Sequence, residues 1–428
     1  VVTGSTAASN SGRLGDACPL CETSSPPPLP TRRLSEEEND LLTRVTGDAP
    51  MGSLLREHFW LPCRLSVAVE AGAAPQRVRL LGERYVVFRA HDGRIGLFDE
   101  DCPHRLVSLA LARNEDNALT CIFHGWKFGV DGTVLDVPTQ PTDREAFCSQ
   151  VPLRHYPVRE AGGLIWVYLG ASVPPFPAFE FTALPPPQVS ATSQVLRFNW
   201  VQALDALHDS AHIGILHQDF LATVPGNADV AAAAADNAPV YEFSDRPAGY
   251  RFAAIRAAAG GRRYCRISEF VAPFFTFIAY RQGYVLIYVP VDDETTQQFL
   301  VQYNPDGPVT AECSPFDDPA DWPAYPEEGP GALWGQDRAA MARGAYSGFG
   351  LHTADFAIGE AQGQRTQRHR EFLHDGDACL AHMRRFLLDC VIEHRRGGVP
   401  AAARHPAGAW GPIVVGDRTV RLDEDWDD

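Results

Sequence analysis

The sequence lacks long apolar segments, clusters of basic residues and the cysteine density of a secreted scaffold. Its longest apolar runs, such as Tyr284 to Val291, have the length of a strand and fall short of the roughly 20 residues that a membrane-spanning helix needs. The formal net charge is -17 and the pI is near 5.2, which disfavours binding to nucleic acid or to an anionic membrane surface. We therefore expect neither a nucleic-acid nor a membrane partner.

Cysteine usage gives an expectation about the compartment. Ten cysteines are scattered over 428 residues, without the density of a disulfide-stapled secreted scaffold. No apolar stretch typical of a signal peptide opens the chain. Both features favour a reducing compartment, so we expect a cytoplasmic protein. Cys18 and Cys21 have the spacing of a metal clip, but without a second pair we interpret them as unstructured thiols.

Composition and pattern divide the chain into four segments. Residues 1–34 are rich in Ser, Thr, Ala, Gly and Pro and are predicted to be a disordered tail. Residues 35–172 begin with the capping-box sequence Ser35-Glu36-Glu37-Glu38 and continue as short β-rich runs separated by Asp-Gly turns. A proline-rich connector over 173–190 follows. Residues 191–428, closed by a long helix, complete a predicted α+β protein with a small antiparallel β domain in front.

The β domain contains two short loops that each carry one cysteine and one histidine. They are Cys102-Pro103-His104 and, after sixteen intervening residues, Cys121-Ile122-Phe123-His124. This content allows both thiolates to bind one iron and both imidazoles to bind the other, as in a Rieske [2Fe-2S] centre. Zinc fingers also use two cysteines and two histidines, but they group a cysteine pair and then a histidine pair. The mixed loops therefore favour the iron–sulfur cluster over zinc.

Two imidazoles in place of two thiolates raise the reduction potential of such a cluster. It would accept electrons readily from a ferredoxin or a flavin reductase. Gly125-Trp126 directly follows the last ligand; glycine lets the backbone approach a cluster, and tryptophan can shield it from water.

Beyond the connector, Asp209, His212 and His217 form the pattern D-x-x-H-x-x-x-x-H in a predicted helical stretch over about 201–217. On a helix Asp209 and His212 share one face, whereas His217 is rotated away by about 140°. A distortion or helix end near Gly214 would turn both histidines toward one ion. Two imidazoles and one carboxylate form the facial triad of non-haem Fe(II) oxygenases. Two hydrogen-bonded helix histidines are the alternative for this pattern alone, and the Rieske signature upstream argues against it.

Both constellations resemble those of one known family. The Rieske domain of ring-hydroxylating oxygenases is similar to two segments of this chain, Cys102 to Arg105 and Cys121 to Phe128. The resemblance to the family extends over about residues 35–400. Further segments are similar to the phthalate dioxygenase-like branch, which includes aromatic ring dioxygenases and aryl O-demethylases. These segments are Leu34 to Asp40, Pro50 to Gly52, Val289 to Asp293 and Met383 to Leu388.

The resemblance implies further site residues and a fold for the second domain. Asp355, in the D-x-A-x-x-E pattern that ends at Glu360, matches the third iron ligand. Asp209 matches a carboxylate that links a cluster histidine, by analogy His124, to His212 of a neighbouring subunit. The second domain is expected to be a helix-grip, START-like catalytic domain. Asp205 and His208 are not ligands in the family, so we expect them behind the ligands or at the surface. The continuation Ala361 to Gln364 departs from the family's Ser-x-Gly-Pro and leaves that pocket wall unassigned.

The resemblance also implies an assembly and a function. The family forms homotrimers or stacked trimers, because the cluster and the iron of one chain are too far apart for fast electron transfer. Electrons from NAD(P)H would pass through a separate ferredoxin/flavin reductase to the [2Fe-2S] cluster and then to a mononuclear non-haem Fe(II). The expected reaction, in aromatic hydrocarbon catabolism, is O₂-dependent dioxygenation or oxidative O-demethylation of a carboxylated aromatic substrate.

Two alternatives stay open at this point. Phe274, Phe275, Phe277 and Tyr280 are candidates for substrate contact, with core packing equally consistent. The chain could also be an electron-transfer Rieske protein without oxygenase chemistry, although the presence of His212, His217, Asp355 and Asp209 argues against this.

Overall fold

The computed structural model describes residues 33–221, 236–278, 283–309, 329–404 and 412–427. Residues 1–32 of the predicted tail, with Cys18 and Cys21, lie outside the described residues, as does Tyr280. No helix in the described ranges is both long and apolar enough to cross a bilayer. Helices and antiparallel sheets together confirm the predicted α+β class.

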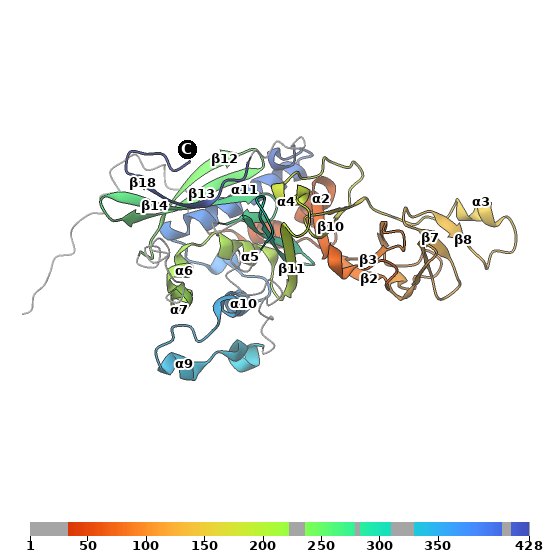
Figure 1. The fold of residues 1–428 in the computed structure, drawn as a ribbon, viewed down its shortest axis with the longest axis horizontal. Helices are drawn as coiled ribbons and strands as arrows, with labels where there is room; N and C mark the ends of the chain where they lie inside the picture. Colours follow the sequence, from red (N-terminus) through yellow and green to blue (C-terminus); the bar gives the residue numbers. More distant parts are fainter. Residues whose placement is uncertain (1–32, 222–235, 279–282, 310–328, 405–411, 428) are drawn as a thin grey trace, which may run out of the picture.

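The first part of the chain forms three small antiparallel sheets with strand orders β1-β10-β9, β2-β3-β4 and β5-β6-β7-β8. Figure 1 shows β7, β8 and α3 (Arg144–Cys148) at the end of the molecule away from the large sheet. A separate apolar core, which includes Phe88, Phe98 and Phe128, fills this end. The strands are β1 (Trp60–Leu65), β2 (Gln76–Leu80), β3 (Glu83–Arg89), β4 (Ile95–Asp99), β5 (Arg113–Glu115), β6 (Ala118–Thr120), β7 (Lys127–Gly129), β8 (Val134–Asp136), β9 (Val158–Ala161) and β10 (Leu164–Tyr168).

The second part is built on an antiparallel sheet with the order β11-β17-β16-β15-β14-β13-β12. One edge of β14 is shared, because β18 pairs with its first half and β15 with its second half. The strands are β11 (Val189–Leu196), β12 (Val240–Arg246), β13 (Gly249–Ala258), β14 (Arg262–Val271), β15 (Phe275–Phe277), β16 (Gly283–Pro290), β17 (Thr296–Tyr303) and β18 (Gly416–Arg421). The helices are α4 (Glu180–Ala183), α5 (Trp200–Leu207), α6 (Ala211–Leu216), α7 (Gln218–Leu221), α9 (Arg338–Ala342), α10 (Leu351–Ala361) and α11 (Ala378–Arg395).

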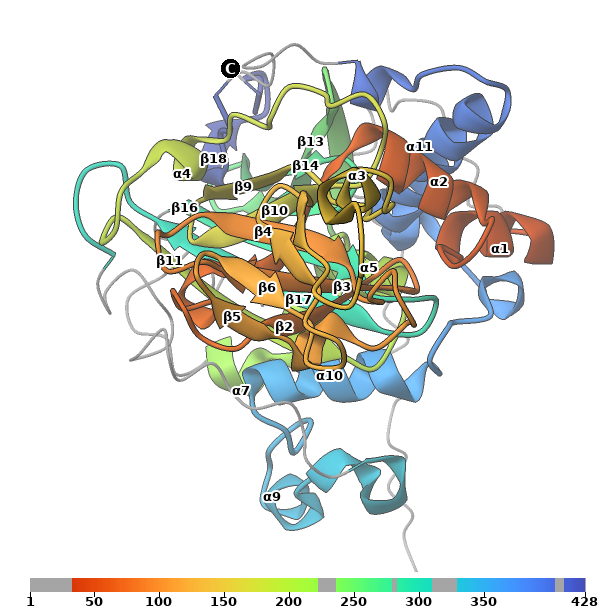
Figure 2. The same ribbon diagram turned by 90° about the vertical axis from the view of Figure 1, so that its right-hand side faces the viewer.

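Two helices that precede β1 pack beside the C-terminal helix α11 (Figure 2). They are α1 (Glu36–Thr43) and α2 (Pro50–His58). The predicted capping box begins α1: the Ser35 hydroxyl accepts a hydrogen bond from the Glu38 N–H, and the Glu38 carboxylate accepts one from the Ser35 N–H. This satisfies two backbone donors at the helix start.

Several sequence predictions are confirmed, and one is wrong. The long helix predicted near the C-terminus is α11, and the strand-length apolar run from Tyr284 lies mostly in β16. The stretch over 201–217 is not one helix, because α5 ends at Leu207 and α6 begins at Ala211.

One face of α5 holds the chain that follows α10. The Asn199 N–H donates to the Gln364 carbonyl (2.7 Å). The Gln202 side-chain amide donates to the carbonyls of Gly359 and Gly363 (both 2.9 Å). Positions 199 and 202 are three residues apart and therefore lie on one side of the helix. Gly359 itself permits close approach, since a Cβ there would lie 2.6 Å from the Phe198 ring.

Asp205 continues the same face and forms a buried ion cluster. Its carboxylate accepts hydrogen bonds from Arg368 (2.8 Å) and Arg384 (2.8 and 2.9 Å). Burial would raise the pKa of Asp205, but the two guanidinium groups outweigh burial and hold this pKa below its usual value. The carboxylate therefore stays ionised and joins α5 to α11 and to the 3-10 helix η6 (Arg368–Arg370).

We predict that Asp205→Asn destabilises the protein by about 3–5 kcal/mol, because it removes the carboxylate that pairs with buried Arg368 and leaves buried Arg384 with Glu371 as its acidic partner. The measurement is the free energy of unfolding in urea. Asp389→Asn is the matched control, since Asp389 pairs with Arg385 at the surface, where an ion pair contributes about 0–1 kcal/mol. Equal losses in the two variants would contradict the proposed role of Asp205.

Candidate metal centres

The two predicted cluster loops follow the same backbone path. In the first, the Cys102 N–H donates to the Val107 carbonyl (2.9 Å) and the Leu106 N–H to the Cys102 carbonyl (2.9 Å). In the second, Cys121 makes the same two bonds with Trp126 (2.8 Å) and Gly125 (2.9 Å). The fourth residue after each cysteine has a positive φ, 60° at Leu106 and 75° at Gly125. Each loop is therefore a closed turn that presents its cysteine and histidine on one side.

The sulfur atoms of Cys102 and Cys121 lie close enough to interact, and both side chains are buried. Burial raises the pKa of the Cys102 thiol to about 11, although backbone N–H groups of His104 and Arg105 donate to the sulfur and oppose the shift. Without a cation the thiolate would be unfavourable here. A bound metal ion reverses this, because a coordinating thiol is deprotonated.

The two loop histidines lie together at the surface of this domain. The ring centroids of His104 and His124 are 4.5 Å apart. The Trp126 ring stacks on His104 at 4.6 Å with an interplanar angle of 5°, as expected for a side chain that shields the site. The His124 Nδ1 atom is buried and has no hydrogen-bond partner in the part of the chain that the structure describes. Paired thiols, paired imidazoles and an unpartnered buried nitrogen fit a Rieske cluster.

At the second site the break between α5 and α6 determines where each ligand points. Asp209 lies in the break, and its Oδ1 accepts from the N–H groups of Ala211 (2.8 Å) and His212 (3.3 Å). This side chain therefore caps α6. Gly214 lies inside α6 without the predicted distortion, but the predicted alternative, a helix end near Gly214, is present, since α6 ends at Leu216. His217 follows the last residue of α6 as its C-cap, so the helix end turns His217 back toward His212.

The structure brings His212, His217 and Asp355 together, with one ligand atom of each within 4.8 Å of the others. His217 Nε2 is 2.9 Å from Asp355 Oδ1, and His212 Nε2 is 3.9 Å from the same oxygen. The centroids of the two rings are 5.2 Å apart. Asp355 lies in α10, 138 residues away from His217 in the sequence.

Charges around His212 favour a cation. Burial would lower the pKa of His212, but the nearby carboxylates of Asp209 and Asp355 outweigh burial and raise this pKa. His212 Nδ1 is 3.7 Å from Asp209 Oδ2. The two acidic groups would stabilise a metal ion as they stabilise a proton. The His217 Nδ1 atom is buried and unpartnered among the described residues. Two imidazoles and a carboxylate with this geometry fit the facial iron triad.

The neighbouring residues Asp205 and His208 are both buried, so they are not surface residues. Asp205 binds two arginines, as described above. The His208 ring stacks on Phe252 at 5.1 Å, and its Nδ1 lies 2.8 Å from the Leu204 carbonyl. Burial lowers the pKa of His208 to about 4. It is therefore a neutral core histidine behind the ligand helix.

The candidate pocket phenylalanines belong to the core. Phe274, Phe275 and Phe277 are each buried. The Phe275 ring lies 4.9 Å from Phe179, and the Phe277 ring lies 5.4 Å from it. Because Phe179 belongs to the segment that joins the two parts of the chain, these rings pack the interface beneath that segment.

Sequence comparisons cover both candidate sites. Residues 59–157 match the family described as the Rieske [2Fe-2S] domain, and residues 167–316 match the family described as LigXa C-terminal domain like. The oxygenase subunit of phthalate 4,5-dioxygenase from Pseudomonas putida is 36% identical over 390 residues, which are 85% of this chain and 88% of that protein. The oxygenase subunit of 3-chlorobenzoate-3,4-dioxygenase from Comamonas testosteroni is 31% identical over 391 residues, 85% of this chain and 90% of that protein.

Solved structures agree on the fold. A carbazole-bound oxygenase in complex with ferredoxin, from carbazole 1,9a-dioxygenase, superposes with a TM-score of 0.54 at 20% sequence identity. The superposition covers 89% of this chain and 97% of that one. A Rieske domain followed by a catalytic domain, over most of the length of its relatives, excludes a lone electron carrier. The chain belongs to the Rieske non-haem iron oxygenases, as an oxygenase subunit of a multicomponent enzyme with a [2Fe-2S] cluster and a mononuclear iron.

Proposed function

We propose that this oxygenase subunit hydroxylates a carboxylated aromatic compound. Cys102, His104, Cys121 and His124 would hold the cluster, and a second set of three residues would hold the iron. The observation that carries the proposal is the convergence of His212, His217 and Asp355 within 4.8 Å, downstream of the paired cysteine–histidine loops. The relatives named above act on phthalate and on 3-chlorobenzoate, which are both aromatic carboxylates.

Two outcomes are consistent with this ligand set. In dioxygenation, O₂, two electrons and two protons add to the ring and give a cis-diol. In O-demethylation, a methyl ether takes one atom of O₂ at its methyl carbon, and the other atom leaves as water with two electrons from the donor and two protons. The hydroxymethyl ether then collapses to a phenol and formaldehyde. Both use the same ligands, and the carbon that the pocket holds at the reacting position decides between them.

Each residue around the proposed iron site would have its own role. A bound Fe(II) supplies O₂ activation at positions that the three ligands leave open. The His217 side chain is 5% exposed, so it would hold the iron from the side that is shielded from solvent. Asp209 caps α6 and faces His212 Nδ1. From this position it would fix the imidazole orientation and receive a contact from the cluster domain of another subunit.

We propose a homotrimer in which the cluster of one subunit serves the iron of the next. Apolar side chains surround the cluster histidines at the tip of the domain and are well exposed, with relative exposures of 72% at Leu106, 57% at Ile122 and 48% at Phe123. Exposed apolar groups of this size often mark an interaction surface. In Figure 1 the strands β7 and β8 lie far along the molecule from α6, which favours transfer between chains over transfer within one chain.

A ferredoxin, itself reduced by a flavin reductase from NAD(P)H, is the proposed electron donor, by analogy with the ferredoxin complex of the carbazole oxygenase.

We also propose a cytoplasmic location. None of the cysteines in the described ranges forms a disulfide, which suits a reducing compartment. The proposed domain limits stay at 35–172, 173–190 and 191–428.

Buried Arg256 is a candidate for recognition of the substrate carboxylate. This residue of β13 is 1% exposed. Its Nη2 donates to the Ser210 carbonyl (2.9 Å) and its Nε to the Asp236 carbonyl (2.8 Å). Its Nη1 is buried and has no partner among the described residues. Because Ser210 adjoins Asp209, an unpartnered guanidinium N–H lies close to the proposed ligand helix.

We predict that His212→Ala abolishes O₂-dependent product formation while the visible absorption of the cluster is retained, because the variant loses the mononuclear iron only. Protein reconstituted anaerobically with a generic reductase would be screened against substituted benzoates and methoxybenzoates. A cis-diol from the unmodified protein would indicate dioxygenation, and formaldehyde would indicate O-demethylation. Unchanged turnover in His212→Ala would refute the iron site.

The trimer is tested by mixing two inactive variants. Cys121→Ser removes the cluster, and His212→Ala removes the iron. Co-expression in equal amounts should restore activity at about one site in four, because only an intact iron beside a neighbour's intact cluster works in a ring. The same variants purified apart and then assayed together without subunit exchange are the control. No recovery in verified mixed oligomers would contradict electron transfer between subunits.

We predict that Arg256→Gln raises KM for a carboxylated substrate about 10- to 100-fold, which corresponds to the loss of one charged hydrogen bond. KM for the methyl ester of the same compound should change little. The control is Arg79→Gln, whose side chain is 54% exposed and pairs with Asp292. An equal effect of Arg256→Gln on acid and ester would mean that Arg256 only supports Ser210.

A further inference from the structure

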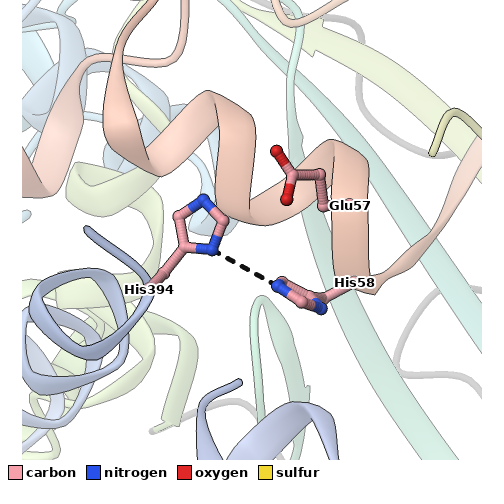
Figure 3. Close-up of side chains that lie close together, drawn as sticks. All are labelled: Glu57, His58 and His394. Carbon is pink, nitrogen blue, oxygen red and sulfur yellow. Dashed lines mark hydrogen bonds between the residues drawn. The ribbon is translucent and has the colours of Figure 1, made fainter. Parts of the chain in front are cut away.

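A second group of potential metal ligands lies outside the two iron sites. Glu57 and His58 end α2, and His394 lies in the last turn of α11. One ligand atom from each residue lies within 4.8 Å of the other two. Figure 3 shows the Glu57 carboxylate beside the His394 ring and the two imidazoles turned toward each other. This group, called here the α2–α11 cluster, plays no part in the oxygenase chemistry proposed above.

The hydrogen bonds of Ser53 fix the proton on His394. The Ser53 hydroxyl donates its proton to Glu57 Oε1 at 2.7 Å. It lies 3.0 Å from His394 Nε2 and, with its own proton engaged, it can only accept there. His394 therefore carries its proton on Nε2 and presents the lone pair of Nδ1 toward His58. Orientation of a histidine through its other ring nitrogen is typical of metal sites.

The two facing nitrogens are spaced as ligands of one ion. His58 Nε2 and His394 Nδ1 are 3.3 Å apart, longer than the usual 2.9–3.0 Å of an N–H hydrogen bond. Tetrahedral zinc with Zn–N distances of about 2.0–2.1 Å places its nitrogen ligands about 3.3–3.4 Å from each other. The rings are nearly perpendicular, at 88°, so neither blocks the other's lone pair. Glu57 is exposed and leaves an entry path from solvent.

We propose that Glu57, His58 and His394 bind a zinc ion, with water as the fourth ligand. A three-residue set of two histidines and one carboxylate is a familiar zinc arrangement. The ion would clip together two helix ends that are 336 residues apart in the sequence. Because His58 is followed at Trp60 by β1, the clip would hold the start of the cluster domain against the C-terminal helix.

The test uses protein that contains both iron centres, dialysed against buffered ZnCl₂, with metals counted by mass spectrometry. We expect one zinc per chain without loss of iron. His58→Ala and His394→Ala should remove this zinc, and zinc binding should raise the Tm of the unmodified protein only. Zinc-edge X-ray absorption should report two imidazoles at about 2.0–2.1 Å.

Two further variants keep the test clear of folding defects. Glu57→Gln changes an exposed side chain, and Ser53→Ala removes the group that orients His394; each should weaken zinc binding about 10- to 100-fold. His374→Gln, at an imidazole that is 77% exposed, should leave it unchanged. The proposal is overturned if zinc binds equally to His394→Ala, if zinc enters only as iron leaves, or if no zinc binds. The first result would indicate a hydrogen-bonded histidine pair, and the second, exchange at His212.

Discussion

The proposed iron site depends on the fit between one face of α5 and the end of α10 with the chain that follows it. His212 and His217 come from one part of the sequence, and Asp355 comes 138 residues later than His217. Local structure cannot bring these groups together, so long-range contacts must do so. Asn199, Gln202 and Asp205 provide them, through the Gln364 carbonyl, the Gly359 and Gly363 carbonyls, and Arg368. Because the interior is closely packed, a small shift of these residues would be passed on to the proposed ligands. The geometry of the ligands therefore depends on residues that would not contact the metal.

The two proposed metal centres are held in place by different kinds of contact. The cluster loops close on themselves through backbone hydrogen bonds that span four or five residues, so each loop is set by its own short sequence. Their histidines reach the surface, where an electron donor can approach. The proposed iron ligands are held by helix ends and by tertiary contacts, and His217 is buried. A cluster near the surface can receive electrons from a protein donor. A buried iron site suits a reaction from which water must be excluded.

Features that depend on residues close together in the sequence could be predicted from it. The capping box at Ser35, the cluster loops and the C-terminal helix follow from short spacings, and the structure contains each of them. The break between α5 and α6 was placed wrongly, because Asp209 accepts hydrogen bonds from the first N–H groups of α6 through its side chain, which no periodicity reveals. Asp355 was found by resemblance, since one carboxylate among 54 acidic residues carries no signal of its own. The α2–α11 cluster could not be seen, because its residues meet only in three dimensions.

Gly359 links the position of the proposed iron ligand Asp355 to the size of a neighbouring side chain. The absence of a side chain lets α10 rest directly on the Phe198 ring, one turn beyond Asp355. The ring thus lies between α10, which carries Asp355, and the start of α5. A change in the size of residue 198 would move α10, and with it Asp355, relative to His217. The geometry of the proposed iron site therefore responds to a residue outside the proposed ligand set.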